Sequence, residues 1–191
     1  MTSTETRASP RTATQIVPLY AGGFGLAQSD ATPPLIDKPR RRIRSIVTTI
    51  GTDRAGDVVV PQGLRNREQY LQNPVVLWAH QRQLPPIGIC RSLDVFDDRI
   101  VAETEFIRGS PLADEIFDLY AEGIIKGWSI GFLPKRIVRI PGDEPGMHGL
   151  RIEEWDLLEY SAVPIPENPE AVTLAIRKGR LSDFLRELYC F

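Results

Sequence analysis

The chain has 191 residues, with 23 lysines and arginines against 25 aspartates and glutamates. This length suffices for one compact domain with a core, and the near-balanced charge gives no argument for a nucleic-acid or membrane partner. No apolar run approaches the roughly 20 residues that span a bilayer, and the N-terminus lacks the apolar region of a secretory signal. Because Cys90 and Cys190 lie far apart, they fit neither a disulfide framework nor a metal motif. We therefore expect a soluble intracellular protein.

The first part of the chain has the composition of a mobile segment. Residues 1–39 are rich in Thr, Ser, Ala, Pro and Gly, and we predict that they form a flexible N-terminal arm. A basic run, KPRRRIR, follows at residues 38–44. Such a run could bind a phosphate backbone, but one short run is a weak signal, and we interpret it as a solvated lead-in to a strand.

The domain proper is expected to span residues 40–179, with order beginning near Ile43. Its first half contains β-branched or alternating runs that end at Gly, Pro or Asp clusters, as strands do. These predicted strands cover residues 43–50, 58–60, 75–78, 87–96 and 99–106. A helical turn is predicted at residues 68–71. The last two strands should pair as a hairpin through Asp97 and Asp98, with alternate residues of the second strand on one face.

The clearest helix is predicted at residues 111–122. Ser110 is a suitable N-cap, Pro111 suits the first helical position, and Gly123 suits the position just past the C-terminus. An apolar stripe runs along this segment at helical spacing. It consists of Leu112, Ile116, Leu119 and Tyr120.

The second half of the domain is again strand-like. We predict two strands at residues 124–133 and 135–140, flanking Pro134, and a long strand or strand pair at 150–163. Residues 168–170 resemble a helix start, and residues 180–191 an amphipathic C-terminal tail. Many non-local strands with one central helix predict an α+β fold, a small, mostly antiparallel β-barrel surrounded by helices, rather than a doubly wound sheet.

The pentapeptide GWSIG at residues 127–131 is the motif most relevant to chemistry. Alone it spells the nucleophile elbow of α/β-hydrolases, which needs a strand before it, a helix after it, and partners in the order Ser, acid, His. Here a helical pattern precedes the motif and β-branched residues follow it. His80 comes before Ser129, so the order is that of another class of serine hydrolase. The glycines on either side would leave the backbone open to a substrate.

A serine nucleophile needs a base, and the chain has two histidines. His148 lies in a Pro/Gly/acidic loop that would hold a base poorly. His80 ends an apolar strand and is followed by polar residues, a suitable place for a fixed side chain at the edge of a cleft. A structural role for either His80 or Ser129 stays open at this level, but the pair is more persuasive than either residue alone.

A third group usually orients the imidazole. Strand alternation places Leu157, Glu159, Ser161 and Val163 on one face of the segment at 150–163. Glu159 therefore lies among apolar neighbours, where an acid is costly unless it is paired. It is either the third member of the site or part of an ordinary ion pair. No metal or cofactor is expected, because no metal-ligand spacing and no phosphate-binding loop occurs.

Four blocks of sequence together resemble the prohead (capsid maturation) proteases of tailed bacteriophages. They are NPVVLWAH at 73–80 with PIG at 86–88, GWSIGF at 127–132, LEYSAVP at 158–164 and NPEA at 168–171. The resemblance extends from about residue 43 to residue 177. It implies a fold like that of the herpesvirus assemblin protease and a serine endopeptidase with His80 as base and Ser129 as nucleophile. The herpesvirus enzymes use a second histidine as third member, for which we expect Glu159 to substitute here.

The resemblance also implies partners and a location. The substrates would be the scaffolding protein, or the scaffold-like part of the capsid protein, and the protease itself, cut inside the assembling procapsid in the host cytoplasm. A homodimer is compatible with it, since the herpesvirus enzymes dimerise; no membrane and no direct nucleic-acid contact is expected. Two other readings remain: an α/β-hydrolase-like esterase, and a catalytically degenerate protease fold that binds scaffold during capsid assembly.

Overall fold

The structure is a computed structural model of the chain, and it describes residues 36–141 and 148–174. These residues belong to one compact unit, Thr32–Phe191. A second unit, Met1–Ala31, lies outside the described ranges, as does the predicted tail at 180–191. No helix in the described part of the chain is long and apolar enough to cross a membrane.

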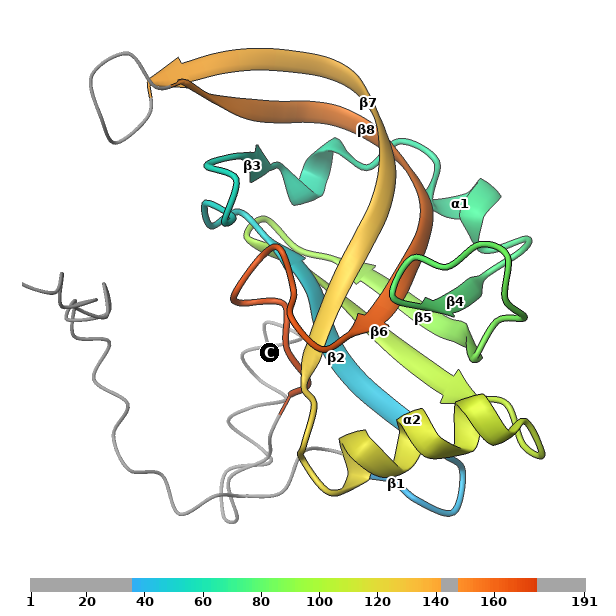
Figure 1. The fold of residues 1–191 in the computed structure, drawn as a ribbon. Coiled ribbons are helices and arrows are strands. Elements are labelled where there is room, and N and C mark those ends of the chain that lie inside the picture. The colour runs from blue at the N-terminus through green and yellow to red at the C-terminus, as the bar shows by residue number, and fades with distance from the viewer. Residues whose placement is uncertain (1–35, 142–147, 175–191) are drawn as a thin grey trace, which may run out of the picture. The chain divides into compact units, whose positions relative to one another are not determined.

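The described residues form an α+β fold around one mixed, mostly antiparallel sheet (Figure 1). Its order is β1-β2-β6-β5-β4-β8-β3, with β7 also paired to β8, and only β3 and β4 run parallel to β8. The strands are β1 (Ile36–Asp37), β2 (Arg42–Thr49), β3 (Val58–Val59), β4 (Val75–Trp78), β5 (Gly88–Val95), β6 (Arg99–Phe106), β7 (Gly127–Pro141) and β8 (His148–Val163). The helices are η1 (Pro61–Gly63), α1 (Arg67–Tyr70) and α2 (Pro111–Ala121).

The continuous ladders make an open sheet, and a further segment contacts both β2 and β7. Figure 1 shows β7 and β8 as a long curved ribbon that crosses in front of β2, β6 and β5. Residues 171–174 lie between the start of β7 and β2, since Trp128 N–H donates to the Ala171 carbonyl and Ile46 N–H donates to the Val172 carbonyl. These contacts are isolated bridges rather than a ladder. The few short helices of the described ranges do not surround the sheet.

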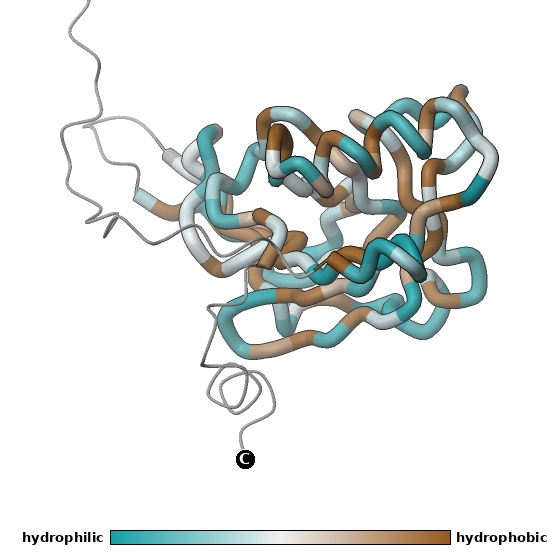
Figure 2. Tube along the Cα trace, turned by 90° about the horizontal axis from the view of Figure 1, so that it is seen from below, coloured by the Kyte–Doolittle hydropathy of each residue, from teal (hydrophilic) through white to brown (hydrophobic). Residues whose placement is uncertain are grey.

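Several predicted elements are confirmed. The strand at 75–78 is β4, and the 87–106 hairpin is β5 and β6, which pair from Gly88 with Phe106 to Val95 with Ile100. The predicted buried face of β6 is 2% exposed or less at each position: Ile100, Ala102, Thr104 and Phe106. In α2, the Ser110 hydroxyl accepts the Ala113 N–H at 3.4 Å, and Gly123 has φ 71°. Figure 2 shows hydrophobic and hydrophilic residues alternating along much of the trace.

Two elements differ from the prediction. β7 continues through Pro134 as one strand, because the only ladder of β7 within the described ranges is with β8, and a register shift next to Pro134 accommodates its missing N–H. Residues 168–170 form a turn and not a helix start. There the Asn168 side chain accepts the Glu170 N–H and donates to the Thr49 carbonyl, so it ties this turn to the end of β2.

The basic run leads into β2, as predicted, and its arginines are paired with acids. Arg42 contacts Glu103 and Glu105 of the neighbouring β6, and Arg44 contacts Asp94 of β5. Hydrogen bonds from Arg91 and Arg42 hold the pKa of Glu105 below its usual range. The remaining pairs join Arg40 to Asp37 and Arg41 to Asp114. Because these guanidinium groups already face carboxylates, the run offers little to a phosphate backbone.

Candidate active site

The β7–β8 ladder places the predicted site residues on one face of the sheet. Ser129 lies directly opposite Ser161, and Gly131 lies opposite Glu159. Directly opposed residues of antiparallel strands project to the same side. On the other flank of β8, Leu77 of β4 is in register with Ser161. We call the side that carries these five residues the site face.

The alternate residues of the same strands point into the core and fix the site face. Trp128 is fully buried, stacks on Tyr120 at 4.9 Å between ring centroids and donates from Nε1 to the Thr173 hydroxyl at 3.0 Å. Tyr160 is also fully buried, and its hydroxyl lies 2.7 Å from that of Thr104. Burial raises the pKa of the Tyr160 phenol well above its usual value. Ser129 and Glu159 are therefore each adjacent to an anchored aromatic residue.

A β-bulge at Leu158 sets the direction of Glu159. Glu159 pairs with Gly131, but the next residue of β7, Phe132, pairs with Leu157, so Leu158 has no partner and is 44% exposed. The Asn66 side chain holds the bulge by bonding to both the N–H and the carbonyl of Leu157. The expectation that Leu157 and Glu159 share a face is therefore wrong, because the extra residue turns Leu157 into the core.

The two glycines of the GWSIG motif are required by packing. A Cβ atom at Gly131 would lie 1.9 Å from Oε1 of Glu159, so the carboxylate extends from β8 across Gly131 of β7. A Cβ at Gly127 would lie 2.7 Å from Cδ of Pro166 and 2.8 Å from the Val163 carbonyl oxygen. The expectation that these glycines leave the backbone open to a substrate is therefore wrong, because neighbouring atoms fill the space beside both of them. Gly131 instead makes room for the acid beside Ser129.

His80 follows β4 in a tight turn with unusual backbone angles. Ala79 and His80 have φ values of 48° and 59°, and Gln81 N–H donates to the Trp78 carbonyl at 2.9 Å, a pattern typical of a type I′ turn. Left-handed φ at residues other than glycine costs on the order of 1–3 kcal/mol each, and such residues cluster at functional sites. The turn persists because Ala79 N–H donates to the Ala162 carbonyl and His80 N–H donates to Oγ of Ser161.

Three side chains form a continuous hydrogen-bonded chain on the site face. Nδ1 of His80 lies 2.7 Å from Oε1 of Glu159, and Oγ of Ser161 donates to Oε2 of Glu159 at 2.7 Å. Glu159 is 3% exposed, and the His80 side chain is 39% exposed. Both carboxylate oxygens are thus occupied, and Nε2, the other ring nitrogen of His80, points away from Glu159. The structure therefore joins His80 to Glu159, as the sequence predicted.

Ser129 is on the same face, one strand away from Ser161. It is half-buried and lines a pocket of about 100 Å³ between the edge of β7 and the end of β2. Within the described residues, no hydrogen bond joins the Ser129 hydroxyl to the His80 ring. Because Ser129 lies inside a strand, and not between a strand and a helix, the nucleophile-elbow reading of GWSIG is wrong.

The second histidine lies at the far end of the ribbon. His148 is the first residue of β8 and pairs with Pro141, 13 positions (161 − 148) before Ser161. At about 3.3 Å per residue, this corresponds to roughly 40 Å along the strand. His148 therefore cannot serve Ser129 as a base.

Ser161 is the residue of this cluster that sequence reasoning missed. It is 0% exposed, and it contacts both the acid and the backbone of His80. The sequence does indicate that Ser161 shares a face with Glu159, since residues two apart in a strand project to the same side. No sequence signal indicates that the chain after β4 turns back to reach it. In the described part of the chain, no group of three or more His, Cys, Asp or Glu residues is placed to hold a metal ion.

Comparison with known proteins gives consistent matches. Residues 45–184 match the family model described as caudovirus prohead serine protease. The chain is 31% identical over 148 residues to a capsid polyprotein of Pseudomonas phage PAJU2, covering 74% of this chain and 21% of that protein. It is 32% identical over 133 residues to a prohead protease of Escherichia phage T5, covering 68% of this chain and 60% of that protein. The chain thus spans less than two thirds of either relative. No solved structure matches it significantly.

Proposed function

Because the chain belongs to the caudovirus prohead serine protease family, we propose that it is a serine endopeptidase with Ser129 as nucleophile, His80 as general base and Glu159 as the residue that orients His80. The observation that carries this assignment is the position of the Glu159 carboxylate, which extends over Gly131 and bonds to Nδ1 of His80. Ser129 is the neighbouring residue on that face of β7, which supports its pairing with His80.

The reaction follows from which nitrogen of His80 is available. With Nδ1 bonded to Glu159, Nε2 takes the hydroxyl proton of Ser129 as Oγ attacks the carbonyl carbon of a peptide bond. His80 then gives this proton to the leaving amine, and an acyl-enzyme forms. A water molecule next loses a proton to His80 and attacks the ester, which releases the new carboxyl end and restores Ser129.

The missing hydrogen bond between Ser129 and His80 fits a site without substrate. Catalytic hydrogen bonds are often long before the Michaelis complex forms. The Ser129 side chain is half-buried and borders a pocket. A serine rotamer change takes picoseconds to nanoseconds when the side chain is free to move. We infer that a change of the Ser129 rotamer brings Oγ to Nε2 when a substrate binds.

Ser161 is a poor alternative nucleophile, although it is closer to Glu159. It is 0% exposed, so a peptide carbonyl cannot approach its oxygen. Its hydroxyl proton is donated to Oε2 of Glu159, and its lone pair accepts the His80 N–H. These bonds support a role in holding the site together, and they leave Ser129 as the reactive alcohol.

The names of the relatives support the choice of substrate. One is named a capsid polyprotein and the other a prohead protease. We infer that this chain cleaves a scaffolding protein, or the scaffold-like part of a capsid protein, and itself, inside the assembling procapsid. Residues 1–39 and 180–191, which flank the protease domain at 40–179, would then be segments for self-cleavage or for docking to the shell.

The same family relationship leads us to propose a fold related to the herpesvirus protease. Closure of the sheet into a barrel is supported by residues 171–174, which contact both β2 and the start of β7. In a closed barrel these residues would form the strand that closes the sheet, next to Ser129. An experimental structure with a continuous ladder from β2 through 171–174 to β7 would establish that the sheet closes into a barrel.

Co-expression tests the proposed function. The full chain is produced together with the capsid protein that carries its scaffold segment, and products are followed by gel and intact mass. Shortening of the partner is expected with the wild-type chain and is lost in Ser129→Ala and in His80→Ala, each of which should unfold at the wild-type temperature. Ser45→Ala is the matched control, because this buried serine lies outside the site. Shortening by Ser129→Ala would refute the nucleophile, and no shortening by wild type would favour a non-enzymatic role in capsid assembly.

A further inference from the structure

A second concave feature borders the proposed catalytic residues. It is a groove of about 400 Å³ that Glu159 helps to line. Its lining is otherwise apolar except for one arginine. The residues besides Glu159 are Val75, Leu77, Arg82, Leu84, Pro86 and Leu158.

The groove lies on the site face. Leu77 is in register with Ser161, and Val75, two residues earlier in β4, points to the same side. The floor of the groove is therefore continuous with the surface on which Glu159 and Ser129 lie. A peptide held over Ser129 would extend across β8 towards this floor.

One wall of the groove comes from the loop that carries His80. Residues 79–86 connect β4 to β5, so His80, Arg82, Leu84 and Pro86 all belong to one short segment. Leu158, which the bulge leaves without a ladder partner, also lines the groove. Leu84 and Leu158 remain 39% and 44% exposed. The device that directs Glu159 towards His80 therefore also places an exposed leucine beside it.

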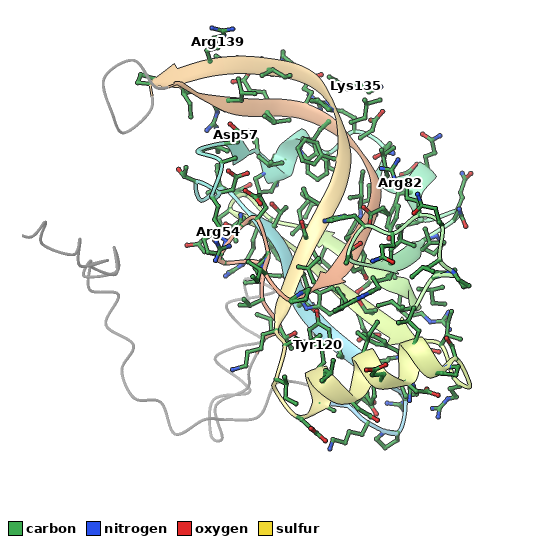
Figure 3. All side chains as sticks on the ribbon, in the orientation of Figure 1. Arg54, Asp57, Arg82, Tyr120, Lys135 and Arg139 are labelled. Atoms are coloured by element: carbon green, nitrogen blue, oxygen red, sulfur yellow. The ribbon has the colours of Figure 1, made fainter. Side chains whose placement is uncertain are left out.

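The charges in the groove favour an acidic residue of a bound peptide. Each oxygen of Glu159 already bonds to a neighbour, His80 or Ser161, and the side chain is 3% exposed. Arg82 is exposed and, among the residues that the structure describes, forms no ion pair or hydrogen bond; Figure 3 shows it on the side of the molecule where the β4–β5 loop lies. The groove thus combines an apolar floor with one unpaired positive charge at its border.

We propose that this groove is a specificity pocket of the protease, which binds a large apolar side chain of the substrate close to the cleaved bond, with an acidic substrate residue next to it against Arg82. The proposal rests on the proposed function, since it takes the peptide to be held over Ser129. Apolar pockets with a few polar groups at the border are typical of such sites. Docking of Leu, Ile, Met or Phe would cover the two leucines that the free protein leaves exposed.

The expected discrimination follows from pocket chemistry. Each methylene group added or removed in an apolar pocket changes kcat/KM by roughly 10- to 200-fold. A substrate with leucine at the selected position should therefore be cleaved at least about tenfold faster than one with alanine. An exposed ion pair contributes much less, so Arg82 should add about a two- to fivefold preference for Asp or Glu at the adjacent position.

A peptide library tests this inference with the full-length chain. Peptides of mixed sequence are digested, and the residues on both sides of each cut are identified by mass spectrometry. Leu158→Ser and, independently, Leu84→Ser should each reduce the apolar preference about tenfold, and Arg82→Glu should replace the acidic preference by a basic one. Controls of matched type and exposure lie on the distal ribbon: Ile137→Ser, at a residue 47% exposed, and Arg139→Glu, which is labelled in Figure 3.

The outcomes separate this inference from the proposed function. If wild type and variants cut the library with the same residue preferences, the groove is not the specificity pocket, although the enzyme is a protease. The same conclusion follows if Ile137→Ser alters the apolar preference as much as Leu158→Ser does. If the folded wild-type chain cuts nothing and a fluorophosphonate fails to label Ser129, the proposed function itself is wrong.

Discussion

Replacing Gly131 by alanine tests how the acid of the site is placed. The new Cβ would lie 1.9 Å from Oε1 of Glu159, whereas ordinary contact begins at 3.4 Å, so the carboxylate must retreat by about 1.5 Å (3.4 − 1.9). Its 2.7 Å bond to His80 cannot be kept unless the strained turn moves as well. A misplacement of 1 Å costs about 100-fold in rate, so kcat should fall about 100-fold. Overpacking should destabilise the fold by about 1–3 kcal/mol.

The assay combines peptide cleavage with thermal unfolding, and the chain offers a matched control. A Cβ at Gly51 would meet Oε2 of Glu170 at 2.7 Å, which is a similar clash with a carboxylate away from His80. Gly51→Ala should keep kcat within about threefold of wild type, since its clash leaves the reacting groups in place. In a Glu159→Ala background, Gly131→Ala should cost little more activity. A folded Gly131→Ala protein that keeps half of the wild-type kcat would refute the placement of Glu159 over this glycine.

Three further predictions concern buried groups. Ser161→Ala removes the hydrogen bonds to Glu159 and to the His80 N–H, so kcat should fall about 10- to 100-fold at unchanged KM. A change confined to KM would contradict the role of Ser161 in positioning these two residues. Ser45→Ala removes a buried hydroxyl that has no hydrogen-bond partner among the described residues. Urea unfolding should therefore give an equal or higher free energy of unfolding, and a decrease of more than about 1 kcal/mol would contradict this prediction. Stability should fall above pH 9, where the unfolded chain releases protons that the folded chain keeps, by up to about 1.4 kcal/mol per pH unit and group. The groups are those whose pKa is raised by burial: Cys90, to about 11, and Tyr70, Tyr120 and Tyr160. Melting curves from pH 8 to 11 measure this, and a flat profile would contradict it.

Local patterns predicted the elements whose causes are local. β4, the β5–β6 hairpin and α2 follow from alternation, turn residues and caps within each segment. Glu159 could be selected because an acid among apolar strand residues must be paired, and the structure pairs it with His80.

The remaining features depend on contacts between distant segments. The bulge at Leu158 is held by Asn66, which lies 92 positions earlier (158 − 66). Simple alternation of side chains along a strand cannot anticipate such a bulge, and it therefore assigned Leu157 to the wrong face. The left-handed turn at Ala79 and His80 uses no glycine, so composition gives no sign of it. Pro134 reads as a strand break, yet β7 tolerates it because β8 is its only ladder partner in the described ranges.

The measurement that tests the account most directly is the rate at which a fluorophosphonate modifies the full-length chain, with the modified residue identified by mass spectrometry. The account predicts one modification, at Ser129, that is slowed at least about 100-fold by His80→Ala while the protein stays folded. Modification of another serine, or an equal rate in the His80→Ala protein, would contradict the claim that His80 activates Ser129.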